Sequence, residues 1–189
     1  LFTPSVTKYE REEQKDSEKK IPNTTSTEKT IIGRDTFTKH TFESGGSVFD
    51  TPDKYKKPID ESYAKYPFLP KGILELVLMN ESSMGTNRTQ YNPKIGEYAW
   101  LVGMATGTSG GKTELIRNGI VPDLSTSQGA IKAAADLLAI RYRKLDGDKN
   151  VVKTYDDPFE LYSKRYAPQL TQDKYEIVQE IANYYANKK

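Results

Sequence analysis

Apolar residues gather most densely in the stretch just after Pro70, and this stretch leads into an acidic residue. Six of the seven residues from 73 to 79 are apolar, and Pro70 suits the first turn of a helix. At about 100° per residue, Leu74 and Val77 fall on one face, and Glu81 continues that face. The pattern therefore predicts a buried helix whose apolar stripe ends in a carboxyl group.

Helical spacing recurs in the C-terminal half of the chain. Apolar residues return at helical intervals between a cap at Ser125 or Ser127 and Leu145, after which Asp146-Gly147-Asp148 would stop the helix. The other predicted segments are an apolar run at residues 98–105, a glycine-rich loop at 106–111, a short helix at 158–166 and a last helix at 172–186. Together they predict an all-helical domain over residues 67–189.

Residues 1–66 show no helical apolar period. Lys, Glu, Asp, Thr, Ser and Pro alternate there with few aliphatic residues, which indicates an extended or disordered arm. Two short segments in it, residues 30–32 and 36–38, could form strands. The expected fold class is thus mainly α, with a helical domain at 67–189 preceded by an extended, polar N-terminal arm at 1–66 that tethers or docks the protein.

The amino-acid composition excludes several kinds of catalytic and metal site. The 189 residues include no cysteine, which excludes disulfides and thiolate metal sites. The one histidine, His40, lies in the arm, where we expect it to be solvated or to pack within the arm. A Ser-His-Asp triad and a histidine-rich metal site are therefore not expected, and no cofactor is implied.

Charge and hydropathy bear on partners and location. A net charge of +2 without a basic patch between aromatic residues gives no reason to expect nucleic acid. No run approaches the ~18 apolar residues of a membrane span, and no signal peptide is visible. Because the chain begins with Leu1 rather than Met, we expect that a leader or tag was removed.

Residues 106–113 raise the alternative of nucleotide binding. Their sequence, T-G-T-S-G-G-K-T, differs by one residue from the phosphate-loop pattern G-x-x-x-x-G-K-[ST], with Thr106 in place of the first glycine. A phosphate-loop fold needs several parallel strands and a second strand that ends in Asp, and no other buried β-type run is visible in residues 67–189. A flexible glycine turn explains the same residues.

Glu81 is the residue whose setting suggests chemistry. A carboxyl group held against aliphatic side chains loses hydration in its charged form, which raises its pKa and allows it to donate a proton near neutral pH. That is the property of a general acid. The alternative is that Glu81 ends a core helix at the surface and has no chemical role.

The order and spacing of four segments in the chain resemble those of the lytic transglycosylases, lysozyme-like enzymes that cleave the glycan of peptidoglycan. In that family a catalytic Glu followed by Ser ends a helix, as in Glu81-Ser82-Ser83, and a segment written G-L-M-Q-L-M-P-S-T follows. Residues 99–107, A-W-L-V-G-M-A-T-G, begin eighteen residues after Glu81. Leu101 and Met104 fit the family pattern, whereas Val102 replaces its glutamine.

Two later segments continue the resemblance, which covers about residues 67–170. Residues 127–138 are similar to the family's helix N-I-x-x-G-x-x-Y-L. Residues 164–168 are similar to its cleft segment A-Y-N-A-G-P, and they keep Tyr166 but lose the Asn, with Ala167 following the tyrosine. The resemblance implies a lysozyme-like helical domain.

The activity that this resemblance implies needs one well-placed acid. Glu81 would protonate the oxygen that links N-acetylmuramic acid to N-acetylglucosamine, and its carboxylate would then take a proton from the muramic 6-hydroxyl, which closes a 1,6-anhydro ring. A hydrolase would want a second carboxylate within roughly 5 to 10 Å, for which Glu97 and Asp123 are candidates. The residues expected to contact substrate are Ser82, Ser83, Tyr98, Trp100, Met104 and Tyr166. For the aromatic residues in this set, the alternative role is packing in the core.

The resemblance also implies a partner and a location. The partner would be the glycan strands of peptidoglycan, met in the periplasm or cell wall or by a virion that breaches the wall. The arm would then dock on a larger envelope or phage assembly. The alternative is a structural or glycan-binding module that kept the fold without catalysis, because the chain departs from the family's pattern at Val102 and Ala167.

Overall fold

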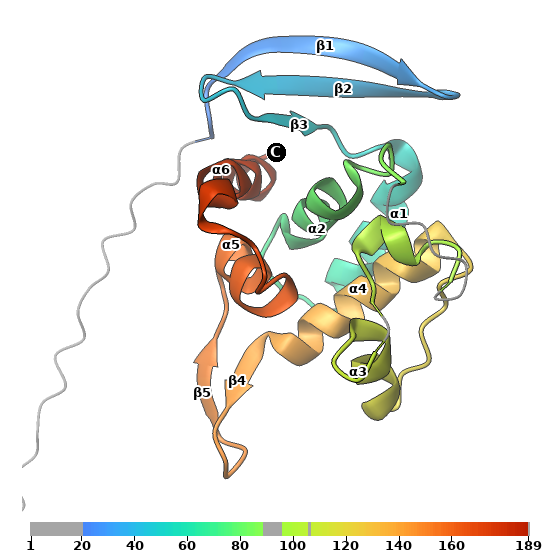
Figure 1. Ribbon diagram of the computed structural model, residues 1–189, viewed down its shortest axis with the longest axis vertical. Coiled ribbons are helices and arrows are strands. Elements are labelled where there is room, and N and C mark those ends of the chain that lie inside the picture. The colour runs from blue at the N-terminus through green and yellow to red at the C-terminus, as the bar shows by residue number, and fades with distance from the viewer. Residues whose placement is uncertain (1–20, 89–95, 106, 189) are drawn as a thin grey trace, which may run out of the picture.

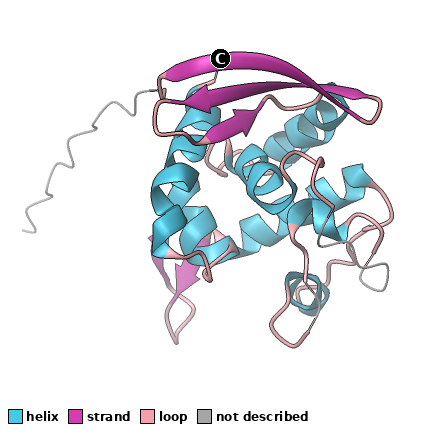
Figure 2. Cartoon of the chain, turned by 45° about the horizontal axis from the view of Figure 1, so that its top comes forward, coloured by secondary structure: helices cyan, strands magenta, loops and turns pink. Residues whose placement is uncertain are grey.

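The structure, a computed structural model, describes residues 21–88, 96–105 and 107–188. In these ranges the chain forms six α-helices, with α2 (Ile73–Ser82) at their centre, and two small antiparallel sheets lie at opposite ends of the molecule (Figure 1). The prediction of a mainly α fold is wrong, because helix accounts for 46% and strand for 17%, so the fold is a mix of α and β. The larger sheet lies over one side of the helices (Figure 2).

The predicted extended arm contains this larger sheet. β1 (Thr24–Ile32) pairs with β2 (Asp35–Phe42), and β2 pairs with β3 (Ser47–Phe49). β1 is exposed along almost its whole length, so the local sequence shows no core of its own. The sheet is instead stabilised by burying three side chains in the core that the helices form, Phe37, Phe42 and Val48. Residues 1–20 of the predicted arm lie outside the described residues.

A helix that the sequence did not predict follows the sheet. This helix, α1 (Asp53–Lys65), buries Tyr55 and Ile59 on one face and packs against α4 (Ser127–Arg141). Pro58 lies inside α1, where it removes one backbone hydrogen bond, and in the sequence this proline favours a turn. Burial against α4 outweighs that local cost.

α2 is the buried centre of the helices, as its apolar run predicts. It contacts α4, α5 (Pro158–Leu161) and α6 (Tyr175–Asn187). Gly72, which precedes α2, has a φ of 84°, and a Cβ at that position would lie 2.6 Å from the backbone nitrogen of Ala186. Glycine therefore lets the start of α2 approach the end of α6 closely. Within the described ranges, none of the helices has both the length and the hydrophobicity that crossing a bilayer requires.

The other predicted segments are present with shifted boundaries. The helix expected to reach Leu145 ends at Arg141, because β4 (Arg143–Leu145) pairs with β5 (Val151–Thr154). The remaining elements are the 3-10 helix η1 (Ala99–Val102), the short helix α3 (Gly111–Arg117), the π-helical turn η2 (Tyr162–Tyr166) that continues α5, and the 3-10 turn η3 (Gln172–Lys174) before α6.

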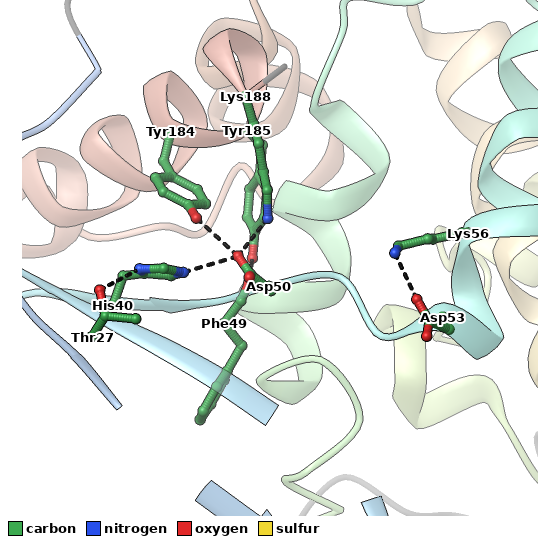
Figure 3. Close-up of polar contacts among 9 residues, drawn as sticks. All are labelled: Thr27, His40, Phe49, Asp50, Asp53, Lys56, Tyr184, Tyr185 and Lys188. Carbon is green, nitrogen blue, oxygen red and sulfur yellow. Dashed lines mark hydrogen bonds and ion pairs between the residues drawn. The ribbon is translucent and has the colours of Figure 1, made fainter. Parts of the chain in front are cut away.

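Asp50 joins the N-terminal sheet to the end of α6. Its carboxylate accepts hydrogen bonds from Lys188, from the Tyr184 hydroxyl at 2.9 Å and from His40 Nε2 at 3.0 Å (Figure 3). Because a carboxylate can only accept, Nε2 of His40 carries a proton, and Nδ1 on the other side of the ring lies 3.0 Å from the Thr27 hydroxyl. His40 therefore packs within the sheet, which is one of the two roles that its position in the sequence suggested.

Asp50→Asn is expected to loosen this attachment and to remove an acid-sensitive part of the stability. Burial alone would raise the pKa of Asp50, but hydrogen bonds from Lys188 and Tyr184 outweigh burial, and the pKa lies below its ordinary value of 3.8. A lowered pKa contributes stability that is present above the unfolded-state value and is lost as the pH falls through the folded-state value. At pH 7 we expect Asp50→Asn to lower the free energy of unfolding by about 1 to 2 kcal/mol. The effect is no larger because the Asp50 side chain is 34% exposed and solvent screens its charge.

Denaturant unfolding of both proteins between pH 7 and pH 2 would measure this difference, which should shrink below the ordinary pKa of 3.8. Asp53→Asn is the matched control, because Asp53 carries the same charge but bonds to Lys56 on the surface of α1 (Figure 3). Equal destabilisation by the two substitutions would contradict an attachment role for Asp50.

Candidate functional site

Glu81 lies at the end of α2, where three elements that are distant in the sequence meet. Its side chain is mostly buried, and Oε1 accepts a 2.7 Å hydrogen bond from the hydroxyl of Tyr162 in η2. The other carboxylate oxygen lies against Gly103, directly after η1, because a Cβ on Gly103 would be 2.1 Å from Oε2. α2, η1 and η2 therefore hold one carboxyl group in place.

The backbone is strained immediately after Glu81. Ser83 and Met84 both have positive φ angles, 48° and 57°, a conformation that is costly for residues other than glycine. Neighbouring contacts must compensate for this cost. Strained backbone of this kind is concentrated at functional sites.

The environment of Glu81 favours its protonated form. Burial raises the pKa of the Glu81 carboxyl above its ordinary value of 4.5, and the hydrogen bond from Tyr162 offsets that effect only in part. Burial also raises the pKa of the Tyr162 and Tyr166 hydroxyls, so both stay protonated at neutral pH. Glu81 thus has a raised pKa and a donor that can stabilise the carboxylate after proton transfer, which are the properties of a general acid.

Two hollows in the surface approach each other at Glu81. The first has a volume of about 210 Å³ and is lined by Glu81 and Tyr162. The second has a volume of about 360 Å³ and is lined by Gly103 and Tyr166, and Gln169 borders both hollows. Ligand pockets usually measure roughly 300 to 1,000 Å³, so each hollow suits one part of a longer ligand. A chain-like ligand that occupies both would pass the carboxyl of Glu81.

A buried donor beside Glu81 has no partner. Asn80 also lines the first hollow, and its Nδ2 finds no hydrogen-bond acceptor in the part of the chain that the structure describes. Buried polar groups without partners are uncommon in folded proteins. This observation adds to the case that the hollow receives a polar ligand.

The two serines after Glu81, expected to contact substrate, have backbone roles. The Ser82 hydroxyl lies 2.9 Å from the carbonyl oxygens of both Leu78 and Leu101, so it ties the end of α2 to η1. Ser83 ends α2 in the left-handed conformation. Neither serine is among the residues that line the two hollows.

Three further expected contacts have different positions. Trp100 is only 5% exposed and belongs to the core, and the half-buried Tyr98 ring stacks on it with 6.4 Å between ring centroids. Neither ring lines the two hollows. Met104 is buried as well, but it does line the second hollow. Core packing, the alternative for the aromatic residues, therefore describes Trp100.

The tyrosine that bonds the acid is Tyr162, whereas Tyr166, which the sequence suggested as a substrate contact, lines the second hollow. The Tyr166 hydroxyl donates to the carbonyl oxygen of Val102 at 2.5 Å, and its ring stacks on that of Tyr162 with 6.0 Å between centroids. The sequence signal for Tyr162 is its four-residue distance from Tyr166, because residues spaced in this way share one side of a helix. Gly103 carried no signal of its contact with Glu81.

The described phosphate-loop residues and the candidate second carboxylates do not line the hollow that contains Glu81. The glycines of the phosphate-loop alternative lead into α3, and the sheets of the described residues are antiparallel rather than the parallel sheet that such a fold requires. Thr106, in the first position of that loop, lies outside the described residues. Glu97 is exposed, and Asp123 bonds to Ser125 before α4. Among the residues that line the two hollows, Glu81 is the one carboxylate.

No family model, no curated protein and no solved structure matches this chain. We therefore infer a function from the geometry around Glu81 and from the order of motifs in the sequence.

Proposed function

We propose that the protein is a peptidoglycan lytic transglycosylase in which Glu81 is the general acid and base. The observation that carries this proposal is the position of Glu81, a mostly buried carboxyl of raised pKa, bonded to Tyr162, where two hollows approach each other. The resemblance of the sequence to lytic transglycosylases indicates the same residue as the acid.

In the proposed reaction the glycan lies along the two hollows and the scissile bond is at Glu81. The protonated carboxyl gives its proton to the oxygen between N-acetylmuramic acid and N-acetylglucosamine as the C–O bond breaks and the muramic ring becomes oxocarbenium-like. The Glu81 carboxylate, stabilised by the Tyr162 hydroxyl, then accepts the proton of the muramic 6-hydroxyl. That oxygen bonds to the anomeric carbon, which completes the 1,6-anhydro ring and restores the acid.

The set of acidic residues supports transglycosylation over hydrolysis. An inverting or retaining hydrolase generally uses a second carboxylate on the other side of the sugar. The linings of both hollows contain no acidic residue besides Glu81. The intramolecular 6-hydroxyl needs no such partner, because Glu81 serves first as acid and then as base.

Digestion of purified peptidoglycan, followed by mass spectrometry of the products, tests the proposal. We expect muropeptides that end in 1,6-anhydro-N-acetylmuramic acid, which are lighter by one water than hydrolytic products. Products with reducing ends would indicate hydrolysis instead. Intact sacculi that retain bound protein would favour the second candidate, a non-catalytic glycan-binding module, which the buried Val102 at the family's glutamine position makes the main alternative.

The proposed substrate, peptidoglycan, also implies where the protein acts. The protein would act in the periplasm or cell wall, or as part of a virion that crosses the wall. The N-terminal sheet, whose strand β1 is exposed, is the part that we propose for docking on a larger assembly.

Tyr162→Phe is expected to shift the pH dependence of cleavage. The Tyr162 hydroxyl lowers the pKa of Glu81 by stabilising the carboxylate, so its removal raises that pKa further. Cleavage requires protonated Glu81 at the start of the reaction, so the limb of the pH profile that falls with rising pH should move to higher pH. We expect kcat/KM to drop about tenfold at the optimum, from the loss of one hydrogen bond to a charged group.

Initial rates of glycan cleavage measured from pH 4 to pH 9 would check this shift. Tyr98→Phe is the matched control, because Tyr98 does not line the two hollows. An unchanged pH profile in Tyr162→Phe would show that the hydroxyl does not act on the catalytic acid.

A further inference from the structure

A third hollow, on the side of α2 that does not carry Glu81, contains a second, partly buried glutamate. This hollow has a volume of about 300 Å³ and lies between α1, α2 and α6. Glu75 of α2 lines it, and its Oε2 accepts a 2.8 Å hydrogen bond from the hydroxyl of Tyr63. The proposed cleavage of glycan makes no use of Glu75.

Among the described residues Glu75 forms no ion pair in contact, although three lysines line the same hollow and the charge of Lys71 acts on it from a distance. Lys56 bonds to Asp53, Lys71 to the carbonyl oxygen of residue 188, and Lys188 to Asp50, as Figure 3 shows for the first and the last of these contacts. A buried carboxyl without a counter-ion is uncommon, because burial penalises its charge. Lys71 compensates the charge of Glu75 only from a distance, and the hollow gives a ligand access to the carboxylate.

The chemistry of the lining is that of a site for a zwitterion. Glu75 and the exposed Asp60 present carboxylate oxygens to an ammonium group. Each lysine ammonium has three donors, and one bond to the protein leaves donors for a ligand carboxylate. The buried Ile59 and Tyr185 add an apolar wall that suits a small side chain.

We propose that this hollow binds an amino acid or short peptide with a free amino group and a free carboxylate, its ammonium at Glu75 and its carboxylate among the lysines. The volume, at the lower end for ligand pockets, suits one or two residues. The proposal does not depend on glycan cleavage, because the site lies outside the two hollows at Glu81.

Titration calorimetry of the whole chain with alanyl-alanine tests the proposal. N-acetylalanine, which lacks the ammonium, and alaninamide, which lacks the carboxylate, are the matched ligands. We expect the dipeptide to bind, and each blocked ligand to bind about 10- to 100-fold more weakly, which is the effect of losing one charge-assisted contact.

Two variants show which residues bind the ammonium end and the carboxylate end of the ligand. Glu75→Gln, which can still accept from Tyr63, should weaken binding of the dipeptide about tenfold and leave N-acetylalanine unchanged. Lys71→Met should weaken both ligands that carry a carboxylate and leave alaninamide unchanged. Glu61→Gln is the control, because it makes the same chemical change at a glutamate that bonds Lys132 outside the hollow. Thermal unfolding of each variant shows whether it is folded.

The proposal is overturned if no dipeptide binding is detected at millimolar concentration in folded protein. It is also overturned if N-acetylalanine binds as tightly as alanyl-alanine, because the hollow would then be a simple anion site. Active glycan cleavage together with either of these results would leave the function proposed for Glu81 intact.

Discussion

Glu81→Gln is expected to abolish cleavage of peptidoglycan while leaving the fold unchanged. Glutamine has nearly the same shape and can still accept the hydrogen bond from Tyr162, but it has no proton to give at neutral pH and cannot take one back. A single acid–base group contributes about 10²- to 10⁴-fold, and we expect the upper end of that range because Glu81 acts in both proton transfers. Release of anhydromuropeptides over time would measure the loss.

Glu97→Gln is the control for this experiment. Glu97 was a candidate second carboxylate, and it is exposed on the surface. We expect full activity from this variant. Loss of activity in Glu97→Gln equal to that in Glu81→Gln would point to a two-carboxylate hydrolase, and full activity in Glu81→Gln would refute the proposed role of Glu81.

Gly103→Ala is expected to have the second largest effect, because it moves the carboxyl that we propose as catalytic without removing it. Gly103 has a φ of 60°, and an added Cβ would lie 2.1 Å from Oε2 of Glu81, so the carboxyl must shift. A misplacement of about 1 Å can lower the rate about 10²-fold. We expect a loss of this size in kcat/KM, together with a loss of stability greater than the ~1 to 2 kcal/mol that a left-handed alanine costs by itself.

Gly119→Ala separates the effect of the left-handed backbone conformation from the effect of the contact with Glu81. Gly119 also has a positive φ, 78°, but an added Cβ would meet nothing within 4 Å. This variant should show the backbone cost with normal cleavage, and comparing thermal unfolding and kcat/KM of the two variants isolates the contact with Glu81. Equal activity of the two variants would mean that Glu81 does not need the space at Gly103.

The parts of the fold that the sequence predicted are the helices with a strong apolar period. α2 and α4 appear at or near their expected positions, because their own residues create a continuous apolar face. α4 nevertheless ends before the predicted boundary, since Arg143–Leu145 hydrogen-bonds to a strand later in the chain. A pattern within one segment carries no information about such a partner.

α1 was missed for the same reason, and the N-terminal sheet was predicted only as two short strand segments, residues 30–32 and 36–38, which lie within the longer β1 and β2. Phe37 and Val48 look isolated in a polar sequence, and they become core residues only when the helices cover them. Pro58 reads locally as a turn, yet α1 continues through it because α4 buries its inner face. The mainly α fold class failed at these elements, whose stability comes from long-range contacts.

The position of Glu81 at the end of a buried helix was readable from the sequence, because helical periodicity is a property of neighbouring residues. The sequence also showed the acid's distance along the chain from the apolar segment that contains Gly103. The packing of distant segments shows that Tyr162 bonds this acid, that Ser82 and Trp100 are buried and that two hollows approach each other at the carboxyl. Those facts depend on α2, η1 and η2 packing together, and packing joins residues whose distance in sequence bears no relation to their distance in space.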